Sequence, residues 1–132
     1  MPKFEISTSA RSQLIDITGQ VQKMIADQKM AEGLCHLWVP HTTAGLSVNE
    51  NADPDVAADI LRQLDRMVPW ENGYRHGEGN SAAHVKSSLM GCQLTVLIEG
   101  GRLQLGTWQG IYFCEFDGPR QRQVWVEFIP KN

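Results

Sequence analysis

Beyond Cys92 the chain consists almost entirely of short apolar segments separated by glycine and proline turns. The segments are CQLTVLIE, RLQLG, GIYFCEF and QVWVEFI, with the pair Gly100-Gly101 after the first and DGPR before the last. Short runs rich in β-branched and aromatic residues and bounded by such turns predict strands, and a Gly-Gly pair between two runs predicts a hairpin. We therefore expect a fold built around antiparallel sheet.

The first half of the chain interrupts its strands with helices. Strands are predicted by KFEIST, QLIDIT and LCHLWVP, and a short one by Leu46 and Val48. Before LCHLWVP, Val21 and Ile25 share one face of a helical pattern. Gly33 follows this pattern and is predicted to stop the helix.

A second helix is predicted after Asp53. The Asp53 side chain can accept hydrogen bonds from the free amides of the first turn, and Pro54 suits the first helical position. The apolar stripe of this helix consists of Val56, Ile60, Leu64 and Met67. Pro69 is expected to mark its end.

A third helix is predicted over SAAHVKSSLM, residues 81–90. Asn80 is expected to cap its first turn, and Gly91 is expected to stop it. Val85 and Leu89 lie one helical turn apart, so we expect both to face the core.

These elements predict an α+β fold. The order does not alternate regularly between strand and helix, which argues against a doubly wound parallel sheet. We expect a two-layer, mainly antiparallel β-sandwich of about eight strands with about three peripheral helices. The length suits one domain, residues 1–132, with no linker or internal repeat.

Charge and cysteine content exclude several classes of protein. A net charge of -3 argues against direct nucleic-acid binding. No run approaches the ~18 apolar residues of a membrane span, and the N-terminus has no apolar signal core. Cys35, Cys92 and Cys114 form no CxxC pair and lie in apolar runs, which favours buried thiols. We expect a soluble, cytoplasmic protein without nucleic-acid or membrane partners.

The segment YRHGEGNSAAHVK, residues 74–86, is unusually rich in chemically active side chains. It contains His76 and His84, and His41 follows a predicted strand elsewhere in the chain. Three protein ligands with one open position are common in zinc sites, so these histidines are candidate metal ligands. The alternative is that they make ordinary hydrogen bonds.

Two loop carboxylates, Glu50 and Glu78, have no evident structural role in the sequence. Beside histidines, carboxylates can bind Mg²⁺, orient an imidazole or act as acid and base. The alternative is that both are solvated loop charges.

A phosphate site is predicted where GEGN enters the third helix. Free amides and the helix dipole favour a negative charge there, and Lys86 lies one turn inside the helix. Thr42 and Thr43 add hydroxyl groups beside His41. The spacing of a P-loop is absent.

The segment GTWQG, residues 106–110, lies between two predicted strands. Its glycines permit a tight turn or a close backbone approach to a ligand. Trp108 could stack on a flat ring, and Gln109 could read its edge. The alternative is a β-bulge with Trp108 packed into a core or a subunit interface.

Three long blocks of the chain resemble a known family. HTTAGLSVNENADPDV, YRHGEGNSAAHVKSSLMG and GRLQLGTWQGIYFCEFDGPR closely resemble blocks of the YjbQ-like family, also called secondary thiamine-phosphate synthase enzymes. The likeness runs from about residue 3 to residue 129. It implies a compact homotrimeric β-sandwich with a weak, promiscuous transferase activity. That activity joins a hydroxymethylpyrimidine diphosphate to a thiazole phosphate with release of pyrophosphate, and the main physiological role is unsettled.

The resemblance also implies roles for particular residues. The family's polar positions include Asp53 and Glu115. Candidate catalytic residues are Glu50, Glu78 and Lys86. Candidate substrate- or phosphate-binding residues are Thr42, Thr43, Asn51, Asn80, Lys86, Thr107, Gln109 and Arg120. Candidate metal ligands are His41, His76 and His84, for a zinc-like ion or for Mg²⁺ bound with a diphosphate.

Two other functions stay open from the sequence. One is hydrolysis of a phosphorylated or amide substrate by metal-bound water, with Glu50 or Glu78 as the base. The other is a non-enzymatic protein that binds a metal or a phosphorylated metabolite. In each case the expected partners are small phosphorylated metabolites and further copies of the same chain.

Overall fold

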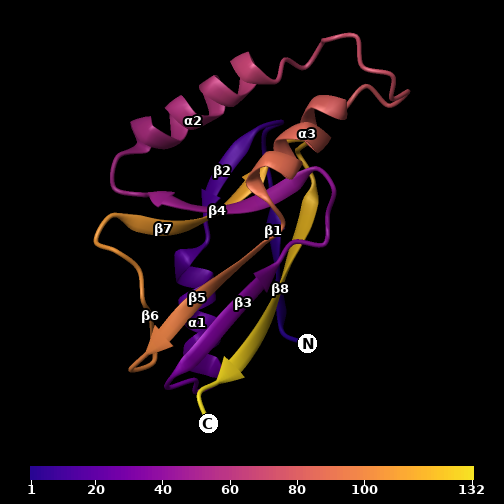
Figure 1. Ribbon diagram of the computed structural model, residues 1–132. Helices are drawn as coiled ribbons and strands as arrows, with labels where there is room; N and C mark the ends of the chain where they lie inside the picture. Colours follow the sequence, from indigo (N-terminus) through magenta and orange to yellow (C-terminus); the bar gives the residue numbers. More distant parts are fainter.

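The computed structural model describes residues 1–132 and contains eight strands and three helices (Figure 1). In chain order they are β1 (Lys3–Ser7), β2 (Gln13–Asp16), α1 (Thr18–Asp27), β3 (Gly33–Trp38), β4 (Ala44–Glu50), α2 (Pro54–Met67), α3 (Ser81–Met90), β5 (Gln93–Glu99), β6 (Arg102–Leu103), β7 (Gln109–Glu115) and β8 (Gln121–Pro130). The predicted α+β class is confirmed, as are the antiparallel sheets and the three helices.

The strands form two sheets. The five-stranded sheet has the order β1-β8-β3-β5-β6, and the three-stranded sheet has the order β2-β7-β4. Every strand pair is antiparallel. The turn at Gly100-Gly101 joins β5 to β6 as the predicted hairpin. The segment DGPR, by contrast, takes the chain from β7 in one sheet to β8 in the other.

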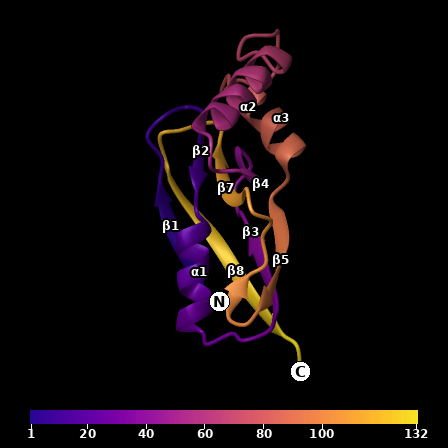
Figure 2. The ribbon, with the colours of Figure 1, turned by 90° about the vertical axis from the view of Figure 1, so that its left-hand side faces the viewer.

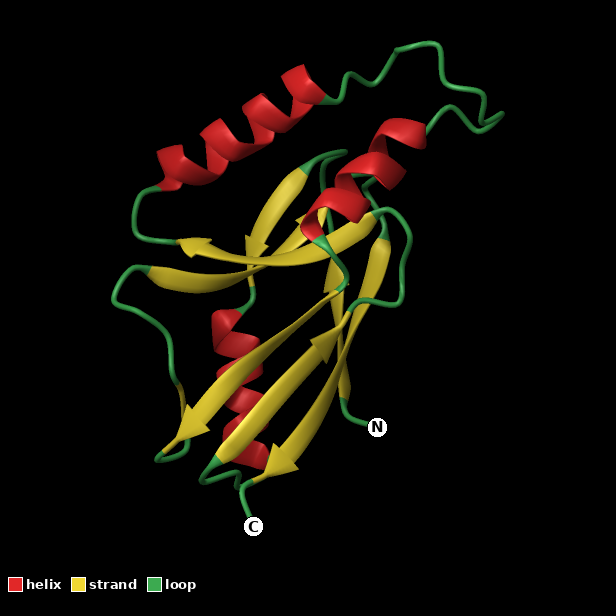
Figure 3. Cartoon of the chain, viewed as in Figure 1, coloured by secondary structure: helices red, strands yellow, loops and turns green.

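Strand β7 separates two groups of buried side chains. Ile111 and Phe113 point into the main core, which both sheets share. Tyr112 and Cys114 point the other way, into a smaller core that Leu64 of α2 and residues of α3 complete. This alternation is the period of two expected for a strand with both faces buried. Helices α2 and α3 therefore cover the side of the three-stranded sheet that faces away from the main core (Figure 3).

The five-stranded sheet has one uncovered face. Helix α1 buries Val21 and Ile25 in the main core, and it lies along one side of the molecule (Figure 2). No helix lies on the opposite face of the sheet (Figure 1), where Leu97 and Ile129 are 60% and 49% exposed.

The predicted start of α2 is confirmed, whereas the predicted end of α1 is wrong. In α2, the Asp53 carboxylate accepts a hydrogen bond from the Asp55 amide at 2.9 Å, and Pro54 is the first helical residue. Helix α1, however, ends at Asp27 and not at Gly33, because Lys29 already adopts a positive φ of 54°. Gly33 instead begins β3, where a Cβ atom would lie 2.2 Å from the carbonyl oxygen of Ile129.

Helix α3 differs most from its prediction. Val85 and Leu89 were expected to face the core, yet they are 40% and 58% exposed. The helix instead buries Ala82, Ala83, Lys86 and Ser87. Small side chains let the helix approach β4 closely, and the Ser87 hydroxyl donates a hydrogen bond to the Ala44 carbonyl at 2.6 Å. Close packing of the backbones therefore sets the orientation of this helix, which a count of apolar residues does not reveal.

The three cysteines form no disulfide bond; Cys35 and Cys114 are buried, and Cys92 is partly buried. Burial raises the pKa of the Cys35 and Cys114 thiols to about 12. None of the three helices combines the length and the apolar composition that a membrane crossing requires.

Candidate functional site

One end of the molecule contains a polar pocket of about 530 Å³. Three segments form it: the loop between β3 and β4, the loop that leads into α3, and the turn between β7 and β8. Its lining residues are Pro40, His41, Thr42, Thr43, His76, Glu78, Asn80, His84, Asp117, Arg120 and Arg122. None of these side chains is hydrophobic. We call this site the polar pocket.

Strand pairing brings the three segments together. The register of β4 and β7 places Ala44 opposite Glu115, and the Phe116 amide donates to the Thr43 carbonyl at 3.1 Å. The segments on either side of this pair therefore leave the sheet at the same end. The contact between Ser87 and Ala44 holds α3 against β4, which positions His84 above the same opening.

His41 is held in one protonation state by its surroundings. Its Nε2 atom accepts a hydrogen bond from the Gln123 amide at 2.9 Å. An Nε2 atom that accepts carries no proton, so the neutral ring holds its proton on Nδ1. Burial, followed by the positive charge of Arg122, lowers the pKa of His41 below its usual value. His41 is therefore a neutral hydrogen-bond donor rather than an imidazolium.

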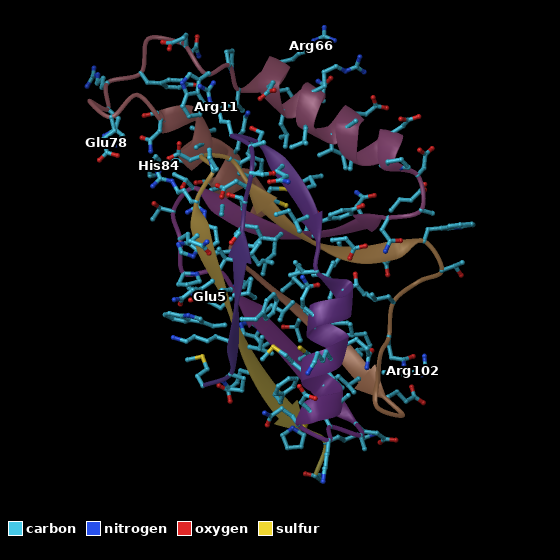
Figure 4. The ribbon with its side chains drawn as sticks, turned by 180° about the vertical axis from the view of Figure 1, so that it is seen from behind. Glu5, Arg11, Arg66, Glu78, His84 and Arg102 are labelled. Carbon is cyan, nitrogen blue, oxygen red and sulfur yellow. The ribbon has the colours of Figure 1, made fainter.

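His76 and His84 contact each other across the mouth of the pocket. Their ring centroids lie 5.6 Å apart, with the rings nearly perpendicular at 82°. The Nε2 atom of His76 lies 3.9 Å from a carboxylate oxygen of Glu78. Figure 4 shows Glu78 and His84 at the same end of the molecule. The predicted approach of these two histidines is therefore present in the structure.

Asn80 does not cap α3 as predicted, because its side chain makes no hydrogen bond to the helix amides. Its Nδ2 atom instead donates to Asp117 at 2.8 Å. The same carboxylate accepts from the Arg120 guanidinium at 3.0 Å. The Oδ1 atom of Asn80 is the one buried side-chain polar atom in the chain that has no partner.

Arg122 forms the floor of the pocket and is almost completely buried. Its Nε atom donates to Glu115 at 2.8 Å, and its Nη2 atom donates to Glu115 and, at 2.8 Å, to the Thr43 hydroxyl. Burial would raise the pKa of Glu115, but hydrogen bonds from Arg122, the Asp117 amide and Thr8 outweigh it and lower that pKa. Glu115 is therefore ionised and forms a buried ion pair with Arg122.

The sequence interpretation left Asp117 and Arg122 out of the site. For Arg122 a signal exists: it lies in phase with Val124 and Val126, which both face the core. Glu115 lies in phase with Phe113 in the same way. Opposite charges at two core-facing positions of neighbouring segments predict a buried ion pair, because neither charge could be buried alone.

Lys86 was predicted to bind phosphate, but the structure places it outside the polar pocket. Its side chain is 3% exposed, and its ammonium group pairs with Asp65 of α2. The ammonium group also lies 5.9 Å from the centroid of the Phe116 ring. Lys86 therefore joins α2 to α3 and is not a ligand of the pocket.

Four other predicted site residues lie at the opposite end of β4 and β7 (Figure 1). They are Glu50, Asn51, Thr107 and Gln109. The Asn51 amide group donates to Asp16 at 2.9 Å, and the Gln109 side chain accepts from the Gly106 amide at 2.7 Å. The first contact joins the end of β4 to the end of β2, and the second closes the turn that leads into β7. Trp108 is 62% exposed beside them and is not packed into the core.

The three histidines predicted to bind a metal do not form a metal centre within the chain. The chain contains no group of three or more His, Cys, Asp or Glu side chains arranged to hold a metal ion. The geometry of His41 explains why this histidine is not placed as a metal ligand. Its Nε2 atom already accepts a hydrogen bond from the Gln123 amide, and its other ring nitrogen carries the proton. The Arg122 guanidinium beside His41 also disfavours a cation there. The side chains that line the polar pocket therefore do not fit a metal ion within one chain.

The fold and the pocket together define a class: an α+β protein of antiparallel sheets with a small polar site that contains two arginines and three histidines. The chain belongs to the family described as UPF0047 protein YjbQ-like, whose model matches residues 2–131.

Several proteins resemble this chain over almost its whole length. The UPF0047 protein YugU of Bacillus subtilis is 51% identical, with 96% of each chain covered. A UPF0047 protein of Methanocaldococcus jannaschii is 49% identical, with 96% of this chain and 92% of that one covered. An uncharacterized conserved protein of the YjbQ/UPF0047 family from Clostridium acetobutylicum has a crystal structure with a TM-score of 0.95 and 51% identity, covering 98% of this chain and 100% of that one.

These relatives confirm the family resemblance and correct the activity inferred from it. The family and its members are described only as UPF0047 proteins, and the solved relative as uncharacterized. Nothing in these descriptions indicates thiamine-phosphate synthase or any other transferase activity. The predicted function as a weak thiamine-phosphate synthase is therefore wrong.

Proposed function

We propose that this chain binds a small phosphorylated metabolite in the polar pocket. The observation that supports this most is the state of Arg122. Its Nε and Nη2 atoms are bonded to Glu115 and Thr43, whereas its Nη1 atom makes no hydrogen bond within the protein. A buried guanidinium with one free nitrogen at the floor of a polar pocket suits an anionic oxygen.

Neighbouring groups add further donors. His41 offers its Nδ1 proton, and Thr42 and Thr43 have hydroxyl groups in the same wall. Each hydrogen bond to a charged group contributes about 1.5–3 kcal/mol. Two of them would give inorganic phosphate a dissociation constant of about a millimolar.

The size and lining of the pocket restrict the rest of the ligand. A volume of about 530 Å³ leaves room for much more than a phosphate group. Most small-molecule pockets are largely apolar, but no lining residue here is hydrophobic. The non-phosphate part of the ligand is therefore polar, with groups such as hydroxyls or amides.

The test is a binding titration with phosphate, pyrophosphate and a panel of polar phosphate monoesters. Arg120 is suited to substitution because its side chain is 52% exposed, so Arg120→Ala should leave the fold intact. We expect this variant to bind the same ligands about ten-fold more weakly, from the loss of one charged hydrogen bond. Lys86→Met, outside the pocket, should bind like the wild type. Equal affinity of wild type and Arg120→Ala would contradict the proposal.

A second candidate function is proton transfer to or from the bound ligand. The observation that favours it is the contact of His76 with His84, beside the Glu78 carboxylate. Two imidazoles and a carboxylate are suited to general acid–base catalysis. A phosphate-ester panel at micromolar protein should show turnover that His84→Gln abolishes. Tight binding without turnover would leave the chain as a binding protein only.

We also propose that the chain assembles as a homotrimer of two-layer β-sandwiches. The support is the uncovered face of the five-stranded sheet, where Leu34, Leu97 and Ile129 line a hollow of about 470 Å³. Trp38 is also exposed on this sheet. Aromatic and apolar side chains of this kind are typical of interfaces between subunits. Sedimentation equilibrium tests the proposal, and a stable monomer would refute it.

A cytoplasmic location is a further proposal, since the chain has three cysteines and no disulfide bond. Cell fractionation would test it.

A further inference from the structure

A continuous chain of buried hydrogen bonds links strand β1 to the polar pocket. The Thr8 hydroxyl, just beyond β1, donates to Glu115 at 2.8 Å. Glu115, at the end of β7, accepts in turn from both Nε and Nη2 of Arg122. Neither Thr8 nor Glu115 lines the pocket, and both are buried. We call Thr8, Glu115 and Arg122 the buried network.

Both carboxylate oxygens of Glu115 accept hydrogen bonds from groups within the protein. Its two oxygens accept from the Thr8 hydroxyl, from two nitrogens of Arg122, and from the backbone amides of Phe116 and Asp117 at 3.1 and 3.0 Å. Glu115 is completely buried, so no water replaces a lost donor. A carboxylate with this many donors is fixed in position.

The two-point contact with Glu115 fixes the orientation of the Arg122 guanidinium. A planar guanidinium bound to a carboxylate through two nitrogens cannot rotate without breaking both bonds. Because Glu115 takes Nε and Nη2, the free nitrogen is Nη1. The network therefore determines which nitrogen is available to a ligand.

The same network also holds the second arginine of the pocket. The Thr8 hydroxyl accepts a hydrogen bond from the Arg120 backbone amide at 2.8 Å. The Asp117 amide bonds to Glu115, and the Asp117 carbonyl accepts from Arg120 Nε at 2.7 Å. Arg120 is thus held through its backbone by Thr8 and through its side chain by Asp117.

We propose that Thr8 and Glu115 are positioning residues that set the anion affinity of the polar pocket through Arg120 and Arg122. This inference rests on the proposed function, since it concerns the same pocket. It assigns a role to Thr8, which does not itself line the pocket and belongs to no recognisable motif in the sequence.

Two explanations of Glu115 predict opposite results, which makes the proposal testable. If Glu115 acted only as a negative charge near the pocket, Glu115→Gln would strengthen phosphate binding, because a repulsive charge is removed. If Glu115 positions Arg122, the same change weakens binding, because an amide cannot accept from both guanidinium nitrogens and the backbone amides. We expect weaker binding.

Thr8→Val is the sharper variant, because it changes no charge and almost no volume. We expect its dissociation constant for inorganic phosphate to rise about five-fold, because valine cannot donate the hydrogen bond that holds the ionised Glu115 in place. Thr8→Ser keeps the hydroxyl and should restore wild-type affinity. Lys86→Met is the matched control: it removes a partly buried ion pair outside the pocket and should leave phosphate affinity unchanged.

The experiment is calorimetric titration of inorganic phosphate into the five folded proteins, the wild type and the variants Glu115→Gln, Thr8→Val, Thr8→Ser and Lys86→Met. The ¹⁵N resonance of Arg122 Nε is followed in parallel. The expected result is weaker binding and a displaced Nε resonance in Thr8→Val, with both restored in Thr8→Ser. If the wild type binds phosphate and Thr8→Val binds it with the same dissociation constant, the positioning role alone is overturned. Absence of phosphate binding by the wild type would overturn this inference together with the proposed function.

Discussion

His41 differs from the other two histidines of the pocket because one of its nitrogens is already bonded to the backbone. The Gln123 amide donates to Nε2, so protonation of that atom would require the loss of this hydrogen bond. Burial and the charge of Arg122 act in the same direction and lower the pKa of His41. The folded chain therefore holds His41 neutral at a pH where an exposed histidine would begin to take up a proton.

This lowered pKa predicts a pH dependence of stability. Below the ordinary histidine pKa of 6.5 the unfolded chain takes up the proton first, so folding loses free energy as the pH falls. We expect the free energy of unfolding to decrease from pH 7 to pH 5. His41→Gln should make this decrease smaller, because a Gln side chain can accept the Gln123 amide without titrating. Urea unfolding at several pH values measures both slopes, and identical slopes would contradict the prediction.

The ion pair of buried Lys86 with exposed Asp65 predicts an asymmetric effect of substitution. The Lys86 side chain is 3% exposed, whereas that of Asp65 is 63% exposed. Lys86→Met leaves a carboxylate that water can solvate, so we expect a loss of about 1 kcal/mol or less. Asp65→Asn leaves a buried ammonium group without its charged partner, so we expect a loss of about 2–4 kcal/mol. Urea unfolding of the two variants tests the order, and a larger loss for Lys86→Met would contradict it.

At the scale of residues, the sequence predicted the pocket only in part. His41, His76 and His84 all lie in polar loops or at a helix start, and loops at the end of a sheet meet in space. Lys86 was placed in the site because helix starts and lysines often bind phosphate, but Asp65 of α2 competes for it. That partner lies in another helix, and no local pattern in the sequence shows that the two helices meet.

At the scale of elements, the end of α3 approaches β4 closely at Gly45. A Cβ atom on Gly45 would be 2.6 Å from the Gly91 carbonyl oxygen and 3.0 Å from Cβ of Met90. Gly45 therefore has no side chain because the end of α3 occupies that space. The same contact explains why α3 turns its small residues inward and leaves Val85 exposed.

This packing predicts opposite effects for two glycine substitutions. Gly45→Ala should destabilise the fold by about 1–3 kcal/mol, because the helix must move away from the strand. Gly19→Ala is the matched control: nothing lies within 4 Å of its Cβ position in α1. Alanine is the better helix residue there, so we expect a gain of about 0.5–1 kcal/mol. Thermal unfolding of both variants tests the signs, and a neutral Gly45→Ala would contradict the packing argument.

The positions of the strands could be predicted from the sequence, whereas the orientation of helix α3 could not. In β5 and β8 exposed and buried residues alternate along most of the strand, whereas β7 is buried on both faces. Both patterns can be read directly from the sequence. What the period does not show is which strands pair. The DGPR turn looks like a hairpin turn, yet β7 and β8 belong to different sheets, and Glu115 of β7 pairs with Arg122 of β8 across them.

At the scale of the whole molecule, the two groups of predicted site residues lie at opposite ends of β4 and β7. His41, Thr42 and Thr43 precede β4, whereas Glu50 and Asn51 end and follow it. The resemblance implies a role for all of these residues, because they fall in one block of the family's sequence, HTTAGLSVNENADPDV. The extended strand between them separates them in space. Within one chain, the polar pocket is therefore built without Glu50 and Asn51.

The uncovered face of the five-stranded sheet gives the last prediction, which concerns the proposed trimer. Leu97 of β5 and Ile129 of β8 lie in the same hollow and are exposed in the single chain. If this face meets another copy, a carboxylate at Leu97 would have to be buried without a partner, at a cost of several kcal/mol for each subunit. Leu97→Glu should therefore dissociate the assembly while leaving the isolated chain folded.

Sedimentation equilibrium distinguishes the outcomes. The wild type should sediment at three times the chain mass of 14.8 kDa, and Leu97→Glu should sediment at the mass of one chain. Leu89→Glu is the matched control, because Leu89 is exposed to a similar extent but lies on α3, away from this face. It should remain trimeric. Dissociation by Leu89→Glu and not by Leu97→Glu would place the interface on the helices, since the cost of a buried carboxylate arises only where the subunits meet.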